Sequence, residues 1–306
     1  MTNPMPDESD TSKILAPLGQ VWLDGKLVPS HLACVSVMDH GLLYGDGAFE
    51  GIRAYNGRIM KLATHLSRLF ESAKAIRLVM PYTQEELAAA VRETLKANGR
   101  TDAYVRLCVT RGIGEMGINP FNSPRPTVFI VTCDLRLYPK DFYENGLPII
   151  SSSVMRNHPA ALSPRIKSLN YLNNVLAKIE AIDAGVFEAV MYNHQGFVAE
   201  CTADNLFIVK GGRVITPPLS AGSLEGCTRN LVMDLAREAG LPMVEQDLTR
   251  HDLYVADEMF LTGTGAEVIP VTLIDKRPIG TGKPGPVTRQ LIGAFRALIA
   301  KGVPEN

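Results

Sequence analysis

The spacing of apolar and polar residues predicts a chain that mixes strands and helices along its whole length. Runs rich in β-branched and aromatic residues predict strands, and Asn56-Gly57 at the end of one such run is typical of a hairpin turn. The predicted strands cover residues 20–28, 35–37, 48–55, 104–110, 127–133, 147–153, 188–192, 205–209 and 258–261.

Apolar residues that recur every three or four positions predict helices between these strands. The helix at 83–98 has the clearest limits, because Thr83 and Glu86 form a capping-box pattern and Gly99 can end it. The other predicted helices cover residues 64–78, 166–178, 228–239 and 287–299.

Lys167 lies in the most informative stretch of the sequence. If residues 166–178 are wound as a helix, apolar and polar side chains separate onto two faces. One face carries Leu169, Leu172, Leu176 and Ile179, and the other carries Lys167, Asn170, Tyr171, Asn174 and Lys178. A lysine beside a tyrosine hydroxyl and two amides suits an amine that forms a Schiff base with a cofactor aldehyde. An ordinary amphipathic helix with a solvated polar face fits the same segment.

The length of the chain, 306 residues, suggests one large or two medium-sized domains. The periodic pattern weakens over 135–146, which we interpret as a linker between a smaller domain at 19–134 and a larger domain at 147–306. The first residues are polar and acidic and lack the apolar core of a signal peptide, so we expect residues 1–18 to form a flexible tail.

Composition and charge exclude several classes of partner. Hydrophobic residues make up 46% of the chain and charged residues 21%, which is typical of a globular protein. The 31 basic and 32 acidic residues nearly balance and form no basic stripe, so we expect no nucleic-acid partner. No apolar run is long enough to cross a bilayer, so we expect no membrane partner and a cytoplasmic location.

The five cysteines predict reduced thiols. Their number is odd and no two have C-x-x-C spacing, which fits a reducing cytosol better than a disulfide framework. The six histidines form no H-E-x-x-H motif and no Cys/His cluster, so we expect no metal site.

Two glycine-rich motifs are poor candidates for nucleotide binding. Residues 112–117 match G-x-G-x-x-G after a strand, but residues 118–124 cannot open the helix that a dinucleotide site requires. Residues 280–285 also match, but they contain Pro284 and lie among turn residues. We interpret both segments as loops.

Two other segments are candidates for anion binding. Gly226-Cys227-Thr228 precedes a predicted helix, whose free N–H groups can bind an anion or can simply be capped by Thr228. Residues 262–266 form a glycine-rich turn after a strand, and such a turn can present amides to an anion.

The roles of Arg68 and Glu200 depend on which charged group lies next to each side chain. Arg68 lies opposite the apolar stripe of the helix at 64–78, where a solvated arginine is ordinary. Glu200 precedes an apolar strand, and a carboxylate among apolar neighbours needs a positive partner, such as a protonated pyridine nitrogen or a lysine.

Taken together, these segments resemble the class IV pyridoxal-phosphate aminotransferases, the fold type IV family, and within it most closely the branched-chain amino-acid aminotransferases. The similarity extends from Val21 to Leu298, and six motifs occur in the family's order. They are Tyr44-Gly45-Asp46-Gly47-Ala48-Phe49-Glu50-Gly51-Ile52-Arg53, His65-Leu66-Ser67-Arg68-Leu69, Ile166-Lys167-Ser168-Leu169-Asn170-Tyr171, Ala199-Glu200-Cys201-Thr202-Ala203-Asp204-Asn205-Leu206-Phe207, Gly226-Cys227-Thr228-Arg229 and Thr262-Gly263-Thr264-Gly265-Ala266-Glu267.

The resemblance implies a two-domain α/β fold, with a smaller N-terminal α/β domain and a larger C-terminal pseudo-barrel domain. It also implies that Lys167 is the catalytic residue and binds pyridoxal 5'-phosphate covalently. Glu200 would pair with the ring nitrogen and Tyr171 with the phenolic oxygen of the ring. The other cofactor-binding residues that it implies are Arg68, Asn205, Leu224, Cys227, Thr228 and Thr264.

The same resemblance implies a substrate pocket. Tyr104 and the turn at Thr264-Gly265 would bind the α-carboxylate, and Tyr44 and Arg106 the side-chain carboxylate of glutamate. The pocket is completed by Phe49 and Gly51. The chain departs from many relatives at Leu107, where proline is common, and at Gly265, where alanine is frequent. These departures bear on substrate range more than on the chemistry.

The activity implied is ping-pong transamination from a branched-chain L-amino acid to 2-oxoglutarate, by a homodimer or larger homo-oligomer. One rival is a D-amino-acid or (R)-amine transaminase of the same fold, but residues 112–122 lack the arginine and histidine of its carboxylate trap. A second rival is an aminodeoxychorismate lyase-like enzyme, which would release pyruvate without an amino acceptor. The presence of Lys167, Tyr171 and Glu200 argues against a third, a non-catalytic cofactor-binding protein.

Overall fold

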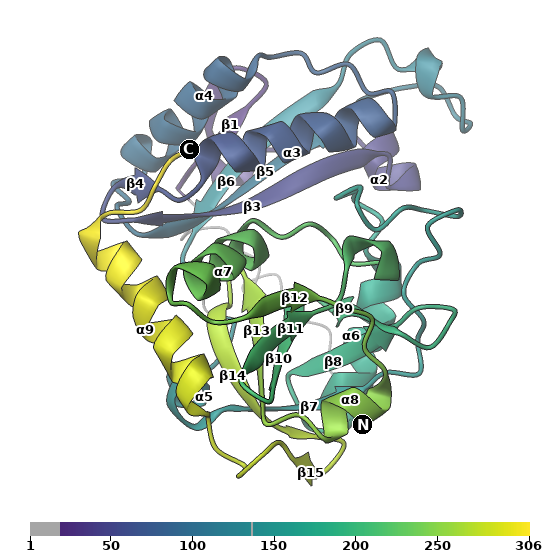
Figure 1. Cartoon of the computed structure of the whole chain (residues 1–306). Helices are drawn as coiled ribbons and strands as arrows, with labels where there is room; N and C mark the ends of the chain where they lie inside the picture. The colour runs from purple at the N-terminus through teal and green to yellow at the C-terminus, as the bar shows by residue number, and fades with distance from the viewer. Residues whose placement is uncertain (1–18, 136) are drawn as a thin grey trace. The chain divides into compact units, whose positions relative to one another are not determined.

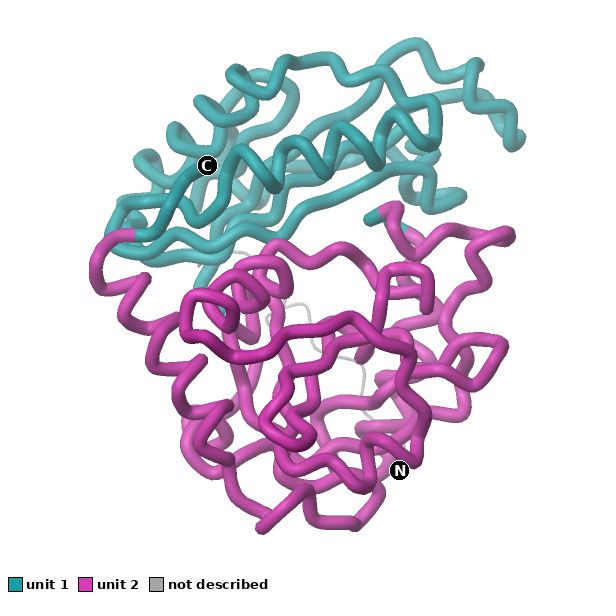
Figure 2. The backbone as a smooth tube through the Cα atoms, viewed as in Figure 1, with its two compact units in different colours: residues 1–135, 167–169, 303–306 teal, residues 136–166, 170–302 magenta. Residues whose placement is uncertain are grey.

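The computed structural model describes residues 19–135 and 137–306, so the tail expected at 1–18 lies outside the described residues. The chain forms two compact units, which Figure 2 shows in different colours. The described part of unit 1 comprises residues 19–135, 167–169 and 303–306, and that of unit 2 comprises residues 137–166 and 170–302.

A six-stranded antiparallel sheet forms the centre of unit 1, in the order β2-β1-β6-β5-β3-β4 (Figure 1). Its strands are β1 (Gln20–Leu23), β2 (Lys26–Pro29), β3 (Gly47–Tyr55), β4 (Arg58–Ile59), β5 (Ala103–Thr110) and β6 (Thr127–Cys133). Asn56 and Gly57 form the hairpin turn between β3 and β4 as predicted, and both adopt the positive φ that this turn requires.

Two long helices cover one face of this sheet (Figure 1). The helices of unit 1 are η2 (Ser30–Leu32), α2 (His40–Tyr44), α3 (Leu62–Ala75), α4 (Gln84–Ala97) and η3 (Pro120–Asn122). The predicted capping box of α4 is confirmed, because Thr83 N donates to Glu86 Oε2 and Glu86 N donates to Thr83 Oγ1. Leu69 on α3 and Val91 on α4 are fully buried in the core of the unit.

Unit 2 is built on a nine-stranded mixed sheet in the order β12-β11-β10-β13-β14-β7-β8-β9, with β15 paired to β14. Its strands are β7 (Leu147–Ser151), β8 (Glu188–Tyr192), β9 (Val198–Cys201), β10 (Asn205–Lys210), β11 (Arg213–Thr216), β12 (Met243–Glu245), β13 (Glu258–Gly263), β14 (Glu267–Ile274) and β15 (Arg277–Pro278). Every residue of β8 and β9 is buried, which explains their nearly continuous apolar sequences.

The helices of unit 2 are α5 (Lys140–Asn145), α6 (Leu172–Asp183), η4 (Leu219–Ala221), α7 (Cys227–Glu238), α8 (Arg250–Tyr254) and α9 (Pro286–Lys301). α7 and α9 pack against each other and against β13. Leu231, Val232 and Ala236 of α7 are buried as its apolar period predicts, while Leu235 is only half-buried. α5 lies within the stretch at 135–146 where the sequence shows no clear period.

Two predicted elements are wrong. Residues 35–37 form no strand. The helix predicted from residue 166 begins only at Leu172, and residues 167–169 are extended. The reason is that β3 satisfies their main-chain groups: Phe49 N donates to Lys167 O, and Leu169 N donates to Gly47 O, each at 3.0 Å.

The two faces of α6 are also reversed relative to the amphipathic interpretation. Asn174, Ala177 and Ala181 are buried, whereas Leu172 is 70% exposed and Ile182 62% exposed. The small alanines let α6 approach β8, and the buried amide of Asn174 is satisfied because Nδ2 donates to Thr202 O at 2.8 Å.

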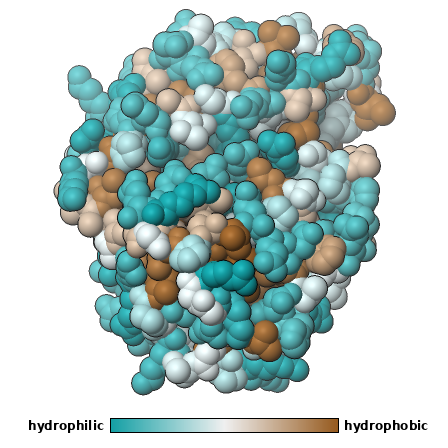
Figure 3. All heavy atoms as spheres, viewed as in Figure 1, coloured by the Kyte–Doolittle hydropathy of each residue, from teal (hydrophilic) through white to brown (hydrophobic). Residues whose placement is uncertain are grey.

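The face drawn in Figure 3 is mostly hydrophilic, with separate hydrophobic areas. Among the described residues, no helix combines the length and apolar character needed to cross a membrane.

Candidate active site

Lys167 is held in unit 1 through its main chain. Besides the two hydrogen bonds that join residues 167 and 169 to β3, Lys167 N donates to Ser72 Oγ on α3 at 3.1 Å. The side chain runs over the ring of Phe49, with Nζ 4.7 Å from the ring centroid. The reactive amine predicted from the sequence is thus attached to a fixed stretch of backbone beside a predicted substrate residue.

β3 and β5 bring four predicted substrate residues together. The strand register places Gly51 opposite Arg106 and Phe49 opposite Cys108. Arg106 Nη2 donates to Tyr104 Oη at 3.0 Å, and Arg106 Cζ lies 4.3 Å from the centroid of the Phe49 ring. A β-carbon on Gly51 would come within 2.2 Å of Tyr104 Oη, so only glycine leaves room for this hydroxyl. Burial raises the pKa of Tyr104, and the hydroxyl therefore keeps its proton.

Tyr44, the remaining unit 1 residue of the predicted pocket, lies at the end of α2. Its hydroxyl accepts a hydrogen bond from Gly117 N at 3.0 Å, and its ring packs edge-on against His40. The structure therefore joins Tyr44 to the 112–117 segment. That segment is a loop, as predicted, and only the three-residue η3 follows it before β6. A contact between Tyr44 and a substrate carboxylate stays a prediction.

Arg68 is bound to a carboxylate that sequence reasoning missed. Arg68 Nε donates to Glu50 Oε1 and Nη2 donates to Glu50 Oε2, both at 2.7 Å, and His65 Nδ1 lies 2.7 Å from Oε2. Burial opposes the charge on this fully buried carboxyl, but Arg68 and His65 outweigh that effect and lower the pKa of Glu50 from 4.5 to about 2. A charged residue next to the apolar residues Ala48 and Phe49 of β3 was the available sequence signal.

Glu200 lies on β9 in a cradle of donors within unit 2. Its Oε1 accepts from Arg156 Nε at 2.9 Å, with Arg156 Nη2 also 2.9 Å away. Its Oε2 accepts from Leu224 N at 3.0 Å and from Asn205 Nδ2 at 3.2 Å. The positive partner of this buried carboxylate in the chain is therefore an arginine, Arg156, which the sequence analysis did not single out.

Asn205 and Leu224, both predicted cofactor residues, are joined to each other as well as to Glu200. Asn205 Nδ2 also donates to Leu224 O at 3.0 Å. A β-carbon on Gly226 would come within 2.0 Å of Asn205 Oδ1. The Asn205 side chain therefore packs directly against the loop that leads into α7. The structure thus brings together three predicted residues of unit 2 in one hydrogen-bonded network.

The first turn of α7 is a suitable anion site. The helix begins at Cys227, its N-cap is Gly226, and no side chain caps it. The expectation that Thr228 could be a plain N-cap is therefore wrong, because Thr228 is the second residue of the helix and is buried. The N–H groups in the first turn of a 12-residue helix favour an anion at this end.

Buried hydroxyls nearby indicate that a polar group belongs in this part of unit 2. Within the described chain, Ser223 Oγ and Thr262 Oγ1 are buried without a hydrogen-bond partner. Buried polar atoms are normally satisfied, so such atoms mark a place for a ligand or an ordered water. Together with the donors at the start of α7, they fit the phosphate of the implied cofactor.

Tyr171 and the turn at 264–266 complete the predicted residues of unit 2. Tyr171 is half-buried and forms the N-cap of α6. Thr264 and Gly265 are half-buried in the tight connection between β13 and β14, where Gly263 pairs with Glu267. Both segments end or begin regular elements, which gives their main chains fixed positions.

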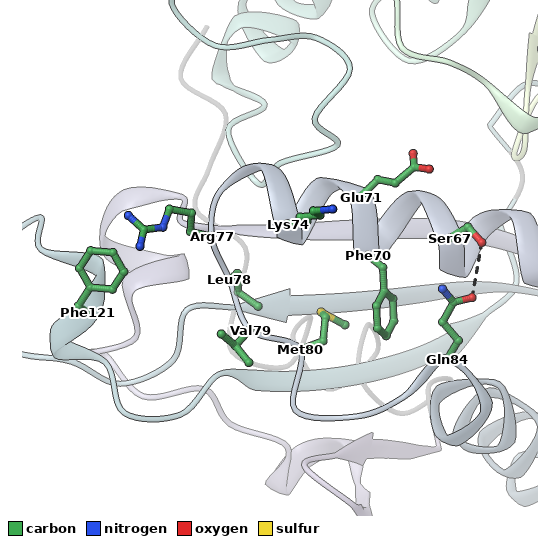
Figure 4. Close-up of a pocket in the computed structure, with 10 residues that line it drawn as sticks. All are labelled: Ser67, Phe70, Glu71, Lys74, Arg77, Leu78, Val79, Met80, Gln84 and Phe121. Atoms are coloured by element: carbon green, nitrogen blue, oxygen red, sulfur yellow. Dashed lines mark hydrogen bonds between the residues drawn. The ribbon is translucent and has the colours of Figure 1, made fainter.

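A hollow of about 770 Å³ lies on the surface of unit 1, over α3, and includes none of the predicted site residues. Figure 4 shows Phe70 and Met80 inside it, with Lys74 and Arg77 at one side. Ser67, at the other side, donates to Gln84 Oε1. The groups that carry the chemistry described above are not part of this hollow.

Comparison with known proteins identifies what the chain is similar to. The family model for amino-transferase class IV matches residues 47–274. A protein of Methanocaldococcus jannaschii, provisionally named a branched-chain-amino-acid aminotransferase, is 48% identical over 92% of this chain and 97% of its own length.

Solved structures agree with this match. The crystal structure of the branched-chain amino acid aminotransferase of Escherichia coli has a TM-score of 0.91 and 34% identity, over 94% of this chain and 97% of that one. A T.th. branched-chain amino acid aminotransferase complexed with N-(5'-phosphopyridoxyl)-L-glutamate has a TM-score of 0.88 and 36% identity, over 94% of this chain and 96% of that one. The fold class predicted from the resemblance is confirmed by these similarities.

Proposed function

Because this chain belongs to the amino-transferase class IV family, we propose that it transfers the amino group of a branched-chain L-amino acid to 2-oxoglutarate with pyridoxal 5'-phosphate as its cofactor. The two solved structures named above are of branched-chain aminotransferases, and one of them is complexed with a phosphopyridoxyl compound. The observation that carries the proposal is the placement of Lys167 over Phe49, next to the paired Tyr104 and Arg106.

The cofactor supplies a ring that can take up the negative charge left when a proton is removed from the α-carbon of an amino acid. Lys167 would hold the cofactor covalently before the substrate binds. Its ε-amine, once released from the cofactor and neutral, would move that proton. The main-chain bonds to β3 and Ser72 fix the starting point of the lysine side chain and thereby limit where its amine can reach.

Glu200 is assigned to the ring nitrogen, and its cradle supports this role. Arg156, the Leu224 amide and the Asn205 amide all donate to this carboxyl group and fix its position, from which it can pair with a protonated ring nitrogen. Tyr171 is assigned to the phenolic oxygen of the ring.

The phosphate is assigned to the start of α7, where Cys227 and Thr228 offer main-chain N–H groups and a hydroxyl. Thr264 and Arg68 are assigned to the same group. Glu50 takes two of the five N–H donors of Arg68 and fixes the plane of its guanidinium.

The substrate carboxylates are assigned to Tyr104, Arg106 and Tyr44, with the turn at Thr264-Gly265 for the α-carboxylate. Arg106 lies against the Phe49 ring and the Tyr104 hydroxyl, so its charge is partly screened when an apolar side chain is bound. This arrangement suits a pocket that must accept both leucine and glutamate.

We assign the protein to the cytoplasm, with the domain limits expected from the sequence, 19–134 and 147–306. We also propose that it is a homodimer or larger homo-oligomer. The exposed leucine and isoleucine side chains of α6 support this assembly, since an apolar helix face of this kind is typical of an interface. Amino acids and 2-oxo acids are its proposed small-molecule partners.

A half-reaction screen tests the proposed function. The cofactor-loaded protein is mixed separately with L-leucine, L-glutamate, D-alanine and (R)-1-phenylethylamine, and the change in cofactor absorbance is followed. Fast responses to the two L-amino acids are expected. A response to D-alanine or the amine without one to L-leucine would overturn the proposed substrate class.

A further inference from the structure

Three oxygen-bearing side chains meet inside unit 2, outside the residues assigned to the reaction. They are Tyr138, which precedes α5, Glu188 at the start of β8, and Asp204, which precedes β10. Tyr138 Oη lies 2.6 Å from Asp204 Oδ2 and 3.3 Å from Glu188 Oε2. Their exposed fractions are 3%, 0% and 3%, so all three groups are shielded from bulk solvent.

A count of protons shows that this cluster is incomplete if both carboxyl groups are ionised. Glu188 Oε1 accepts hydrogen bonds from Ala189 N and Thr202 N, so both of its further contacts are to main-chain donors. The tyrosine hydroxyl has one proton and can donate it to one carboxylate only. The other carboxylate would then face a hydroxyl oxygen without any proton between them.

One additional proton on Asp204 completes the chain of hydrogen bonds. Asp204 then donates to Tyr138 Oη, and Tyr138 donates to Glu188 Oε2. Burial and the charge of Glu188 favour this state and raise the pKa of Asp204 from 3.8 to about 7. Burial and the same two carboxyl groups raise the pKa of Tyr138, so the hydroxyl does not lose its own proton.

The surrounding charges do not remove the need for this proton. Lys178 of α6 lowers the pKa of Asp204, whereas Glu200 of β9 raises it. The ammonium of Lys178 is also bound to the carbonyl oxygen of Phe187. Cys201 stays a neutral thiol, because burial and the nearby carboxylates raise its pKa.

Asp204 lies directly against the turn that is assigned to an anion. A β-carbon on Gly263 would come within 2.1 Å of Asp204 Oδ1, and Gly263 immediately precedes Thr264 and Gly265. β10 and β13 also pair Asn205, the next residue, with Thr262. A second negative charge at Asp204 would therefore oppose a phosphate or carboxylate at this turn.

We propose that Asp204 is a positioning residue that shares a proton with Tyr138 and Glu188. This proton keeps Asp204 neutral, so no negative charge beside the 262–266 turn repels the bound anion. Loss of this proton at alkaline pH weakens anion binding at the turn. The identity of the anion rests on the proposed function, but the shared proton does not.

The test uses Asp204→Asn, because the amide can donate to Tyr138 Oη as the protonated acid does but cannot ionise. Its matched control is Asp234→Asn, which removes an exposed carboxylate on α7. Two anions are titrated: pyridoxamine 5'-phosphate into the apoprotein, and 4-methylvalerate into the cofactor-loaded protein. Pyridoxamine, which lacks the phosphate, is the ligand control.

The expected result is a pH-dependent ratio of dissociation constants. The dissociation constant of wild type is divided by that of Asp204→Asn. For the anion that occupies the turn, this ratio should rise roughly fivefold between about pH 6 and about pH 9, a typical coupling between linked sites. The phosphate arm and the carboxylate arm show which anion that is. A flat ratio in both arms, or an equal rise with pyridoxamine, overturns the proposal.

Stability provides a readout that needs no ligand. The pKa of Asp204 is higher in the folded state, about 7, than its value of 3.8 in the unfolded chain. The free energy of unfolding should therefore fall as pH rises from 3.8 toward about 7. This loss should disappear in Asp204→Asn. Tyr138→Phe should shift the midpoint of the loss, because it removes the hydroxyl that shares the proton with Asp204. Identical pH profiles in wild type and both variants would contradict a shared proton. Amino transfer can fail without affecting these profiles, so the two proposals fail separately.

Discussion

The carboxylate of Glu50 binds the guanidinium of Arg68 through two hydrogen bonds of 2.7 Å, across 18 positions of sequence and between β3 and α3. The Glu50 side chain is fully buried, and the Arg68 side chain is only 11% exposed. It turns a helix arginine that periodicity alone describes as solvated into a group with a fixed orientation.

Replacing Glu50 with glutamine should weaken binding of pyridoxamine 5'-phosphate about tenfold or more, because Arg68 loses a charge-assisted bidentate partner. It should also lower the free energy of unfolding by about 3–5 kcal/mol, the usual cost of breaking a buried pair. Cofactor titration and urea unfolding measure the two effects. Glu71→Gln, an exposed change on the same helix, is the control and should match wild type.

Acid should remove the contribution of Glu50. Its pKa falls from 4.5 to about 2 on folding, so its stabilisation is present above pH 4.5 and is lost as pH falls toward 2. The difference corresponds to roughly 3 kcal/mol at 1.36 kcal/mol for each unit of pKa. Urea titrations should show that the difference in unfolding free energy between wild type and Glu50→Gln becomes smaller over this pH range. A difference that does not change with pH would contradict the pairing.

Arg156→Met should leave the carboxylate of Glu200 buried without its cation. The expected loss of unfolding free energy is about 3–5 kcal/mol, and Arg156→Lys should restore only part of it, because lysine cannot form the two contacts of the guanidinium. The exposed pair Arg165–Glu225 provides the control, with a loss of about 1 kcal/mol or less for Arg165→Met. Equal losses in the two methionine variants would contradict the role assigned to Arg156.

Arg106→Leu should separate the two kinds of substrate. Loss of a charged hydrogen bond costs about 1.5–3 kcal/mol, so kcat/KM for 2-oxoglutarate should fall roughly 10- to 100-fold. The value for 4-methyl-2-oxopentanoate should change little, because its side chain has no carboxylate. Arg100→Leu, which breaks an ion pair with the exposed carboxylate of Asp134 elsewhere in unit 1, is the control. A uniform fall for both oxo acids would show that Arg106 does not select the carboxylate.

Local patterns predicted the elements whose ends are set by neighbouring residues. The capping box at Thr83 and Glu86 and the turn at Asn56-Gly57 both depend on contacts within a few positions. Residues close together in the sequence determine these features, so local sequence patterns predict them.

Contacts between distant segments decided the features that the sequence did not predict. Lys167 is extended because β3, more than 100 residues earlier, takes its main-chain hydrogen bonds. The partner of Glu200 is Arg156, 44 positions away, and no periodicity indicates that pairing. The face of α6 with Ala177 and Ala181 is buried because small side chains pack closely, although its leucines give the stronger apolar pattern.

The most direct test of the account is the site of covalent attachment. The cofactor-loaded protein is reduced with borohydride, digested, and mapped by mass spectrometry. The account predicts a pyridoxyl group on the ε-nitrogen of Lys167, and none after the same treatment of Lys167→Ala. Attachment at another lysine, or none on fully loaded wild-type protein, would contradict it.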